Sequence, residues 1–214
     1  GVSEVFATED AVERFGGLLA DAPVQLVTER AAKALSDTVT PVGLVAVCAM
    51  PDAPLADVLA ADPRLVAVAV ETSEPGNVGT LIRLADAMGA DAVILAGNSV
   101  DPYNGKCLRA SAGSIFALPV VQESDVRALI DALREAGLTT RATTLDGELN
   151  LDDADLSGPT AWMFGSEAHG LSAEVAAMAD ERVVIPMSGG AESLNVAAAA
   201  AICLYQSARA LRRG

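Results

Sequence analysis

Five polar side chains lie in or next to three glycine-rich segments of the sequence, and together they form an unusual polar set that could bind and position a ligand. Amide and hydroxyl groups position a substrate through hydrogen bonds, and an arginine can hold a phosphate or stabilise a developing negative charge. The segments are residues 71–79, 165–170 and 186–195, and the side chains are those of Asn77, Arg83, Glu167, Ser193 and Asn195.

Three of these residues also have an ordinary structural explanation. Asn77 and Ser193 stand at the start of predicted helices, where a short polar side chain can cap a free backbone amide. Arg83 lies inside a helical segment and could be a solvated or ion-paired surface arginine. A single glycine-rich loop is most often a simple turn, so the functional interpretation depends on three such loops meeting at one place.

Several common catalytic sites are not indicated. Gly76-Asn-Val-Gly79 has the wrong spacing for the G-x-G-x-x-G loop of dinucleotide-binding proteins, and no G-x-x-x-x-G-K-[ST] segment is present. Ser166 lacks the G-x-S-x-G turn of serine hydrolases. His169 is the one histidine, which excludes a multi-histidine metal centre, and we expect no metal. The cysteines are far apart and are interpreted as buried free thiols of a cytosolic protein; they are Cys48, Cys107 and Cys203.

The composition is that of an acidic globular protein. Of the 214 residues, 29 are acidic and 14 are basic, so the formal net charge is −15. This charge argues against nucleic-acid binding over the whole surface, and a local basic patch would consist mostly of arginine because the chain has only two lysines, Lys33 and Lys106. Hydrophobic residues make up 51%, which is enough for a sizeable core. No apolar run reaches the length of a membrane span, and no basic-then-apolar leader follows Gly1, so export is not indicated.

From residue 64 onward, apolar runs typical of buried strands alternate with helical segments. This alternation predicts an α/β fold with a parallel sheet and helices on both faces. Ligands bind at the carboxyl ends of the strands in such sheets, where the three glycine-rich loops fall. The predicted strands are residues 65–70, 92–96, 115–121, 139–145, 161–164 and 182–185, and the main helices are residues 77–88, 125–136 and 194–211.

The N-terminal part forms a separate pattern. Residues 1–49 predict a small α/β unit, with strands over 2–7, 24–27 and 43–48 and helices over 9–20 and 29–35. Residues 50–63 contain three prolines and are a candidate linker with a short helix over 55–60.

Four segments resemble those of the SpoU (TrmH-like) RNA 2′-O-ribose methyltransferases of the SPOUT superfamily. Residues 77–83 with 85–95 resemble motif 1, Phe164-Gly-Ser-Glu-Ala-His-Gly-Leu171 resembles motif 2, and residues 185–196 resemble motif 3. Residues 101–113 resemble a further recurrent segment. The four occur in family order from residue 65 to the C-terminus, which makes the resemblance specific. His169 stands where the family usually has a small residue and is interpreted as a loop substitution, not as a catalytic base.

The resemblance implies a trefoil-knotted methyltransferase domain over residues 64–214, a homodimer, and S-adenosyl-L-methionine bound in the knot. Catalysis is assigned to Asn77, Arg83, Glu167, Ser193 and Asn195, and cofactor contact to Gly165, Ile185, Met187 and Leu194, with Thr144 and Leu145 as weaker candidates. A guanidinium stays protonated at neutral pH, so we expect Arg83 to hold a phosphate and stabilise the developing alkoxide while Ser193 and Asn195 orient it. RNA contact would need basic residues on the same face as Arg83, namely Arg30, Lys106 and Arg109.

Residues 1–49 resemble the latter part of an L30e-like RNA-binding domain, which favours ribosomal RNA (23S) as the substrate. The alternatives are a tRNA 2′-O-methyltransferase and a non-catalytic RNA- or ribosome-binding paralogue that keeps the knot. Loss of Arg83, Glu167 or Asn195 would favour the paralogue, and all three are present. A plain nucleotide-binding flavodoxin-like protein would be a monomer without affinity for S-adenosylmethionine.

Overall fold

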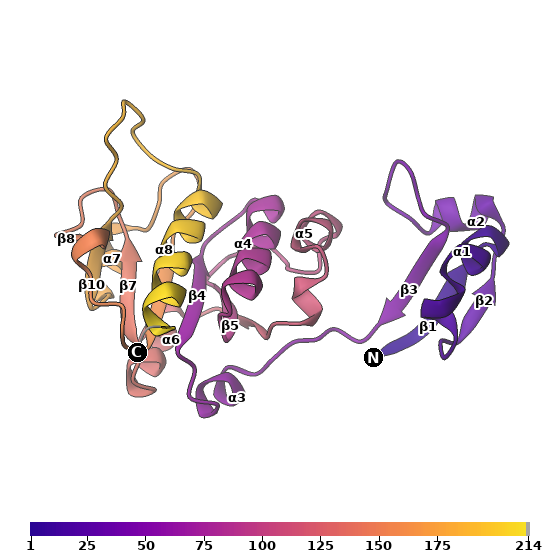
Figure 1. The fold of residues 1–214 in the computed structure, drawn as a ribbon, viewed down its shortest axis with the longest axis horizontal. Coiled ribbons are helices and arrows are strands. Elements are labelled where there is room, and N and C mark those ends of the chain that lie inside the picture. The colour runs from indigo at the N-terminus through magenta and orange to yellow at the C-terminus, as the bar shows by residue number, and fades with distance from the viewer. Residues whose placement is uncertain (213–214) are drawn as a thin grey trace. The chain divides into compact units, whose positions relative to one another are not determined.

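The computed structural model describes residues 1–212 and divides the chain into two compact units, Gly1–Met50 and the part from Pro51 onward (Figure 1). The short helix α3 (Leu55–Ala60) belongs to the second unit, because its Val58 is buried in that unit's core. The segment that the sequence indicates as a linker, residues 50–63, therefore packs in large part against the second unit.

The first unit is a three-stranded sheet with two helices. Strand β1 (Val2–Ala7) lies between β2 (Val24–Leu26), which runs parallel to it, and β3 (Leu44–Cys48), which runs antiparallel. Helix α1 (Glu9–Leu19) begins at Thr8, whose side chain accepts a hydrogen bond from the Ala11 amide. Helix α2 covers Glu29–Ala34. A small apolar core lies between β1 and α1 and consists of Val5, Ala7, Ala11 and Leu19.

The second unit is built on a sheet of seven parallel strands in the order β6-β5-β4-β9-β7-β10-β8. The inner strand β4 is buried along its whole length, because it pairs with strands on both sides and is covered on both faces. The strands are β4 (Leu65–Val70), β5 (Ala92–Ala96), β6 (Val120–Glu123), β7 (Thr139–Thr143), β8 (Leu149–Asn150), β9 (Thr160–Phe164) and β10 (Glu181–Val184).

Helices cover both faces of this sheet, as the sequence predicts. Alternate residues of β4 point to opposite faces, so Leu65, Ala67 and Ala69 join one core and Val66, Val68 and Val70 join the other. The first core includes α4 (Pro75–Met88), α5 (Gly105–Ser111) and α8 (Val196–Leu211). The second includes α3 and α6 (Val126–Glu135), with α7 (Ala173–Met178) packed against it.

Helices α4 and α5 pack without room for a side chain at Gly79. A Cβ atom there would lie 2.4 Å from the carbonyl oxygen of Cys107 and 2.7 Å from the Cβ of Ala110. This close approach fixes α4, which carries Asn77 and Arg83, against its neighbour.

The strand predicted over residues 115–121 is wrong in its first half. Gly113 takes a positive φ of 94°, and Ser114–Phe116 form a turn of 3-10 helix (η1) that begins there. The strand β6 starts only at Val120, after Pro119, which has no amide hydrogen to donate to a sheet. Three short elements have no counterpart among the predicted ones: β8, α7 and the 3-10 turn η2 (Leu151–Asp153).

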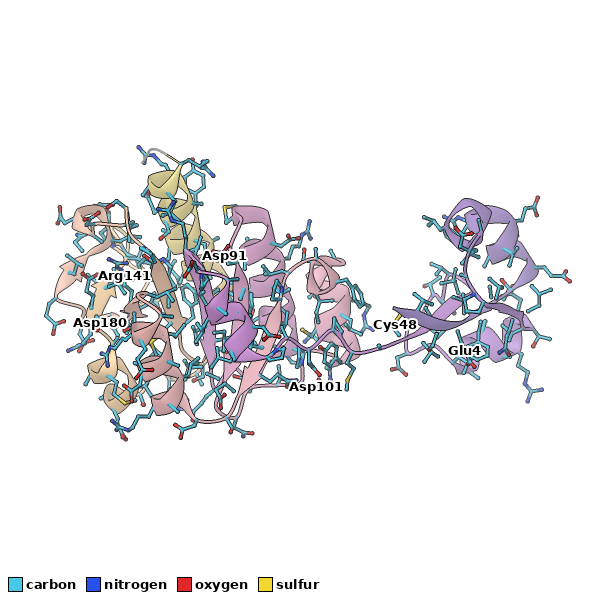
Figure 2. The ribbon with its side chains drawn as sticks, turned by 90° about the horizontal axis from the view of Figure 1, so that it is seen from below. Glu4, Cys48, Asp91, Asp101, Arg141 and Asp180 are labelled. Carbon is cyan, nitrogen blue, oxygen red and sulfur yellow. The ribbon has the colours of Figure 1, made fainter. Side chains whose placement is uncertain are left out.

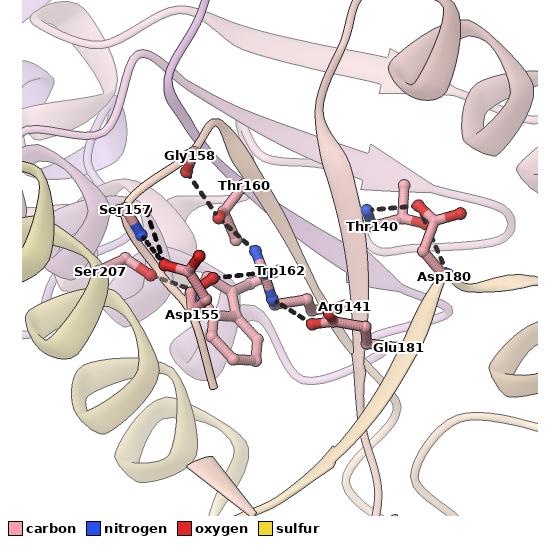
Figure 3. Close-up of polar contacts among 10 residues, drawn as sticks. All are labelled: Thr140, Arg141, Asp155, Ser157, Gly158, Thr160, Trp162, Asp180, Glu181 and Ser207. Carbon is pink, nitrogen blue, oxygen red and sulfur yellow. Dashed lines mark hydrogen bonds and ion pairs between the residues drawn. The ribbon is translucent and has the colours of Figure 1, made fainter. Parts of the chain in front are cut away.

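Arg141 on β7 is a buried cation with three polar partners (Figure 3). Its side chain is 5% exposed, and its Nε donates to Glu181 Oε2 at 2.6 Å. The other guanidinium nitrogens donate to Thr160 Oγ1 at 2.5 Å and to the Asp155 carbonyl at 2.7 Å. Arg141 therefore ties β7 to β10, to β9 and to the loop before β9.

Asp180, just before β10, makes a second link to β7 (Figures 2 and 3). Its carboxylate accepts hydrogen bonds from the Thr140 amide at 2.8 Å, from Thr140 Oγ1 at 2.7 Å and from Arg134 Nε at 2.8 Å. Burial raises the pKa of this carboxyl, but the hydrogen bonds from Thr140 and Arg134 outweigh burial, so the pKa lies below its usual value. Asp91 makes a similar link at the start of β4, where it accepts from the amides of Arg64 and Leu65.

Arg141→Met should lower the free energy of unfolding by about 3 kcal/mol, because the partly buried Glu181 carboxylate and the buried Thr160 hydroxyl would lose their partner. Urea unfolding followed by the fluorescence of Trp162, the one tryptophan, measures this change. The matched control is Arg127→Met, because the ion pair of Arg127 with Glu174 is 65% and 78% exposed and should contribute less than about 1 kcal/mol. Equal losses for the two variants would contradict the structural role of Arg141.

Asp180→Asn should lower the melting temperature at pH 7 by roughly 2–4 °C, which corresponds to about 1 kcal/mol for a domain of this size. Because the folded-state pKa of Asp180 is lowered, its ionised form stabilises the fold above about pH 4 and this stabilisation is lost as the pH falls through the folded-state pKa. The difference between wild type and variant should therefore shrink in acid. Calorimetry from pH 7 to pH 3 checks this, and a difference that does not change with pH would refute it.

Candidate functional site

A cavity of about 680 Å³ opens at the carboxyl ends of the central strands of the second unit. The loops after β7, β9 and β10 and the first turns of α8 line it. The glycine-rich segments 165–170 and 186–195 contribute to these walls, as the sequence predicts for a parallel sheet.

The loop after β9 is folded tightly against the cavity. A Cβ atom at Gly165 would lie 2.0 Å from the carbonyl carbon of Gly170 and 2.1 Å from the amide nitrogen of Leu171, so only glycine fits there. The Gly170 amide donates to the Ser166 carbonyl at 2.9 Å, which closes residues 166–170 into a compact turn. This turn presents Glu167 and His169 at the cavity.

Three side chains from the three segments form one hydrogen-bonded chain. Asn77 Nδ2 donates to Glu167 Oε1 at 3.0 Å, and Asn195 Nδ2 donates to Asn77 Oδ1 at 3.3 Å. Asn195 Oδ1 in turn accepts from the Ala197 amide at 2.8 Å and so caps α8. We call this group the Glu167–Asn77–Asn195 chain.

The capping roles expected for Asn77 and Ser193 are wrong. The cap of α4 is Glu74, whose carboxylate accepts from the Gly76 amide at 3.2 Å, and Pro75 opens the helix. Asn77 therefore lies inside the first turn, where its side chain is free to bridge two loops. The cap of α8 is Asn195, two residues beyond Ser193. Ser193 lines the cavity and does not cap the helix.

The other expected catalytic residue, Arg83, is not in this group. It lies on the exposed side of α4 and does not line the cavity. Within residues 1–212 its guanidinium makes no hydrogen bond or ion pair. Its charge is therefore available to a ligand that approaches α4 from solvent.

All six residues expected to contact the cofactor line the cavity. The side chains of Met187 and Leu194 are 36% and 37% exposed and that of Leu145 is 67% exposed, so this is an apolar surface open to solvent. The six are Thr144, Leu145, Gly165, Ile185, Met187 and Leu194.

The wall on the β7 and β10 side contains polar residues that the sequence analysis missed. Arg182 forms ion pairs with Asp146 at 2.7 Å and with Glu148 at 2.9 Å, and the hydrogen bond and charge of Arg182 lower the pKa of Asp146. Two buried polar atoms of this wall, Thr144 Oγ1 and Arg182 Nε, have no hydrogen-bond partner in the described chain. The available signal was that a charged residue, Arg182, begins an otherwise apolar predicted strand.

The basic residues expected to contact RNA occur in both units. Lys106 and Arg109 lie on α5, which packs against α4, and Arg30 lies on α2 of the first unit. Lys106 Nζ lies 2.5 Å from Glu74 Oε1, and this contact, together with the Gly76 amide, holds the pKa of Glu74 below its usual value. Lys106 thus also supports the start of α4.

The cysteines have no disulfide, but they are not all buried. Cys48 is exposed on β3, contrary to the prediction. Burial raises the pKa of Cys107 to about 11 and that of Cys203 to about 12, so both thiols stay protonated at neutral pH.

In the part of the chain that the structure covers, no group of three or more His, Cys, Asp and Glu could hold a metal ion. No helix over residues 1–212 is both long and apolar enough to cross a membrane.

Comparison with known proteins identifies close similarity over most of the chain. The model of the SpoU rRNA Methylase family matches residues 64–205. A Bacillus subtilis protein named 23S rRNA (guanosine(2553)-2′-O)-methyltransferase RlmP is 38% identical over 180 residues, which are 84% of this chain and 70% of that protein. A Streptomyces viridochromogenes protein named 23S rRNA (uridine(2479)-2′-O)-methyltransferase is 40% identical over 142 residues, which are 64% of this chain and 50% of that protein.

A solved structure extends the similarity to both units. The SpoU methyltransferase AviRb from Streptomyces viridochromogenes, in complex with the cofactor AdoMet, superimposes with a TM-score of 0.87 and 31% identity. The match covers 100% of this chain and 85% of that one.

Asn195→Ala should lower the melting temperature by roughly 2–4 °C, because α8 would lose its cap at a cost of about 1 kcal/mol. Asn195→Asp keeps the oxygen that caps α8 but loses the Nδ2 donor to Asn77, so it should melt close to the wild type. Differential scanning calorimetry of the three proteins separates capping from bridging. An aspartate variant as unstable as the alanine variant would show that the contact with Asn77 carries the stability.

Proposed function

Because the chain belongs to the SpoU rRNA methylase family, we propose that it transfers a methyl group from S-adenosyl-L-methionine to a ribose 2′-hydroxyl of ribosomal RNA. The observation that carries this proposal is the Glu167–Asn77–Asn195 chain beside a cavity lined by all six expected cofactor residues. Both curated relatives described above are named for 2′-O-methylation of 23S rRNA, which supports 23S rRNA as the substrate.

The residues of the cavity fit the cofactor. Its volume of about 680 Å³ lies in the range of pockets that hold ligands of this size. Ile185, Met187 and Leu194 offer apolar contact, and Gly165 lets the loop after β9 fold tightly against the cavity. When bound, S-adenosylmethionine supplies a methyl group that its positive sulfonium already activates.

The chain's own residues must position the ribose and stabilise the negative charge that develops on its oxygen. Asn77 holds the Glu167 carboxylate at a fixed place, and Asn195 holds Asn77. Because both ends of the Asn195 amide are engaged, Asn195 is a positioning residue, and the exposed Ser193 is the better candidate to contact the ribose. Arg83, exposed and unpaired within residues 1–212, would hold an RNA phosphate and stabilise the alkoxide.

The knot and the homodimer belong to this proposal. The threading of residues 186–195 past the loops after β7 and β9 would form the trefoil knot of the family.

Helix α8 has an exposed stripe at helical spacing, made of Ala198, Ile202, Tyr205 and Arg209. The side chain of Ile202 is 36% exposed and that of Tyr205 is 51% exposed. A second copy packed on this stripe would bury both side chains.

The proposed domains are a partial L30e-like RNA-binding domain over residues 1–49, a linker over 50–63 and the knotted methyltransferase domain over 64–214. The order of strands and helices in the first unit, and Arg30 on α2, support an RNA-binding role. The first unit would bind RNA through Arg30, and the second unit would bind RNA through its own residues on α4 and α5.

Methyl-labelled S-adenosylmethionine should label unmodified 23S rRNA and not bulk tRNA. Arg83→Ala should reduce the rate roughly 10²-fold, because one group that stabilises the transition-state charge is removed. Arg83→Lys should keep part of the rate, since a lysine still supplies a positive charge. The matched control is Arg127→Ala, an exposed arginine on α6 outside the cavity, which should retain the wild-type rate.

Wild-type activity in Arg83→Ala would refute the role of Arg83. Labelling of tRNA alone would show that tRNA, and not 23S rRNA, is the substrate. Absence of label in both RNAs would refute the proposed activity.

A further inference from the structure

The 3-10 turn η1 exposes an aromatic ring outside the cavity. A 3-10 helix has three residues per turn, so the three side chains of η1 point in three different directions. Ser114 and Ile115 point inward and are 9% and 1% exposed, which leaves Phe116 pointing to solvent with 63% of its surface exposed. By contrast, Trp162 and Phe164 are fully buried. Phe116 therefore offers a free ring face to a partner.

Phe116 belongs to a surface formed by α4, α5 and η1. Helices α4 and α5 lie side by side (Figure 1), and η1 packs against both. Gly79 of α4 lies against α5, and Arg83 follows it by one helical turn on the same side of α4. Arg109 is exposed on α5. The surface thus combines an aromatic ring with two arginines.

This surface is basic although the chain as a whole is acidic. The elements α4, α5 and η1 contain three basic residues and one acidic residue, Asp86, whereas the formal net charge of the chain is −15. Residues 102–122 contain no aspartate or glutamate. Lys106 is engaged in an ion pair, but Arg83 and Arg109 make no hydrogen bond or ion pair within residues 1–212. Two free cations on a face with few acids favour an anionic partner.

A free ring together with free arginines is typical of surfaces that bind unpaired nucleotides. Bases stack on aromatic side chains and phosphates bind arginine, whereas a base inside a duplex stacks on its neighbours and has no free face. A second copy of the chain is disfavoured as the partner. In a two-fold contact this surface would face itself and bring the arginines of both copies together.

We propose that Phe116 stacks on an unpaired base of the RNA substrate while Arg109 binds an adjacent phosphate. This inference rests on the proposed function, in which Arg83 holds an RNA phosphate. It adds that the RNA bound at this surface contains an unpaired nucleotide, as in a loop or a bulge. Phe116 is a positioning residue, because it holds the RNA and touches none of the reacting atoms.

Fluorescence anisotropy with two labelled oligomers of equal length and charge tests the proposal: decauridylate and an abasic ribose-phosphate decamer. The wild-type protein should bind decauridylate at least about fivefold more tightly than the abasic decamer, as expected for one stacked base. Phe116→Ala should lose this preference, and Phe116→Trp, which keeps a ring, should retain it. Arg109→Ala should weaken the binding of both oligomers by a similar factor, because they carry the same phosphates.

Methylation kinetics provide a second readout. With unmodified 23S rRNA, Phe116→Ala should raise the KM roughly fivefold and leave kcat unchanged, because the ring contributes to RNA binding and not to the reaction step. Binding of S-adenosylhomocysteine, measured by calorimetry, should also stay at the wild-type affinity.

The matched control is Leu18→Ala, which removes an apolar side chain without a ring that is 83% exposed on α1, and it should keep the wild-type preference. A Phe116→Ala protein with the wild-type preference would overturn the proposal. So would a Phe116→Ala protein whose mass in light scattering is half that of the wild type, because the surface would then be a contact between copies.

The wild-type protein separates this inference from the function on which it rests. Wild-type protein that shows no preference between the oligomers but binds S-adenosylhomocysteine would overturn this inference alone. Wild-type protein that binds neither oligomer and no S-adenosylhomocysteine would overturn the proposed function as well.

Discussion

Two hydrogen bonds to the side chain of Asn77 hold three distant parts of the chain at one edge of the sheet. Glu167 is 90 residues away in sequence and Asn195 is 118 residues away, yet both contact the same amide. This is feasible because β4 and β9 are neighbours in the sheet and because α8 packs against α4. The shape of the cavity therefore depends on the parallel sheet, whose strand order brings the ends of separate loops together.

Most of the second unit could be predicted because its strands are buried on both faces. An apolar run such as residues 65–70 has few alternatives, and the structure places β4 on those residues. The prediction failed where local backbone geometry overrides composition: Ile115 and Phe116 are strand formers, but Gly113 and Pro119 on either side enclose a 3-10 turn. The helix α7 was missed because its sequence, Ala173–Met178, carries little apolar periodicity.

The candidate site could be located from the sequence, but its internal contacts could not. Two of the segments that resemble family motifs, residues 164–171 and 185–196, line one cavity, and Asn77 of a third segment is hydrogen-bonded to both of them. The roles of individual side chains, however, depend on small shifts in helix ends. Glu74 caps α4 three residues before Asn77, and this leaves the Asn77 amide free to bridge. The ion pairs of Arg182 could not be predicted, because its partners Asp146 and Glu148 come from the loop after another strand.

The position of β9 in the sheet affects how the protein can form during synthesis. Leu65 on β4 pairs with Thr160 on β9, and Trp162 on β9 donates from Nε1 to Ser207 on α8 at 2.8 Å. The core thus joins segments that are synthesised at different times. Strand β4 cannot pair with β9 until β9 has left the ribosomal exit tunnel, and such long-range contacts slow folding. The nascent chain must therefore keep its most apolar strand, β4, partly unpaired until β9 has emerged, which makes this segment a site where chaperones can bind.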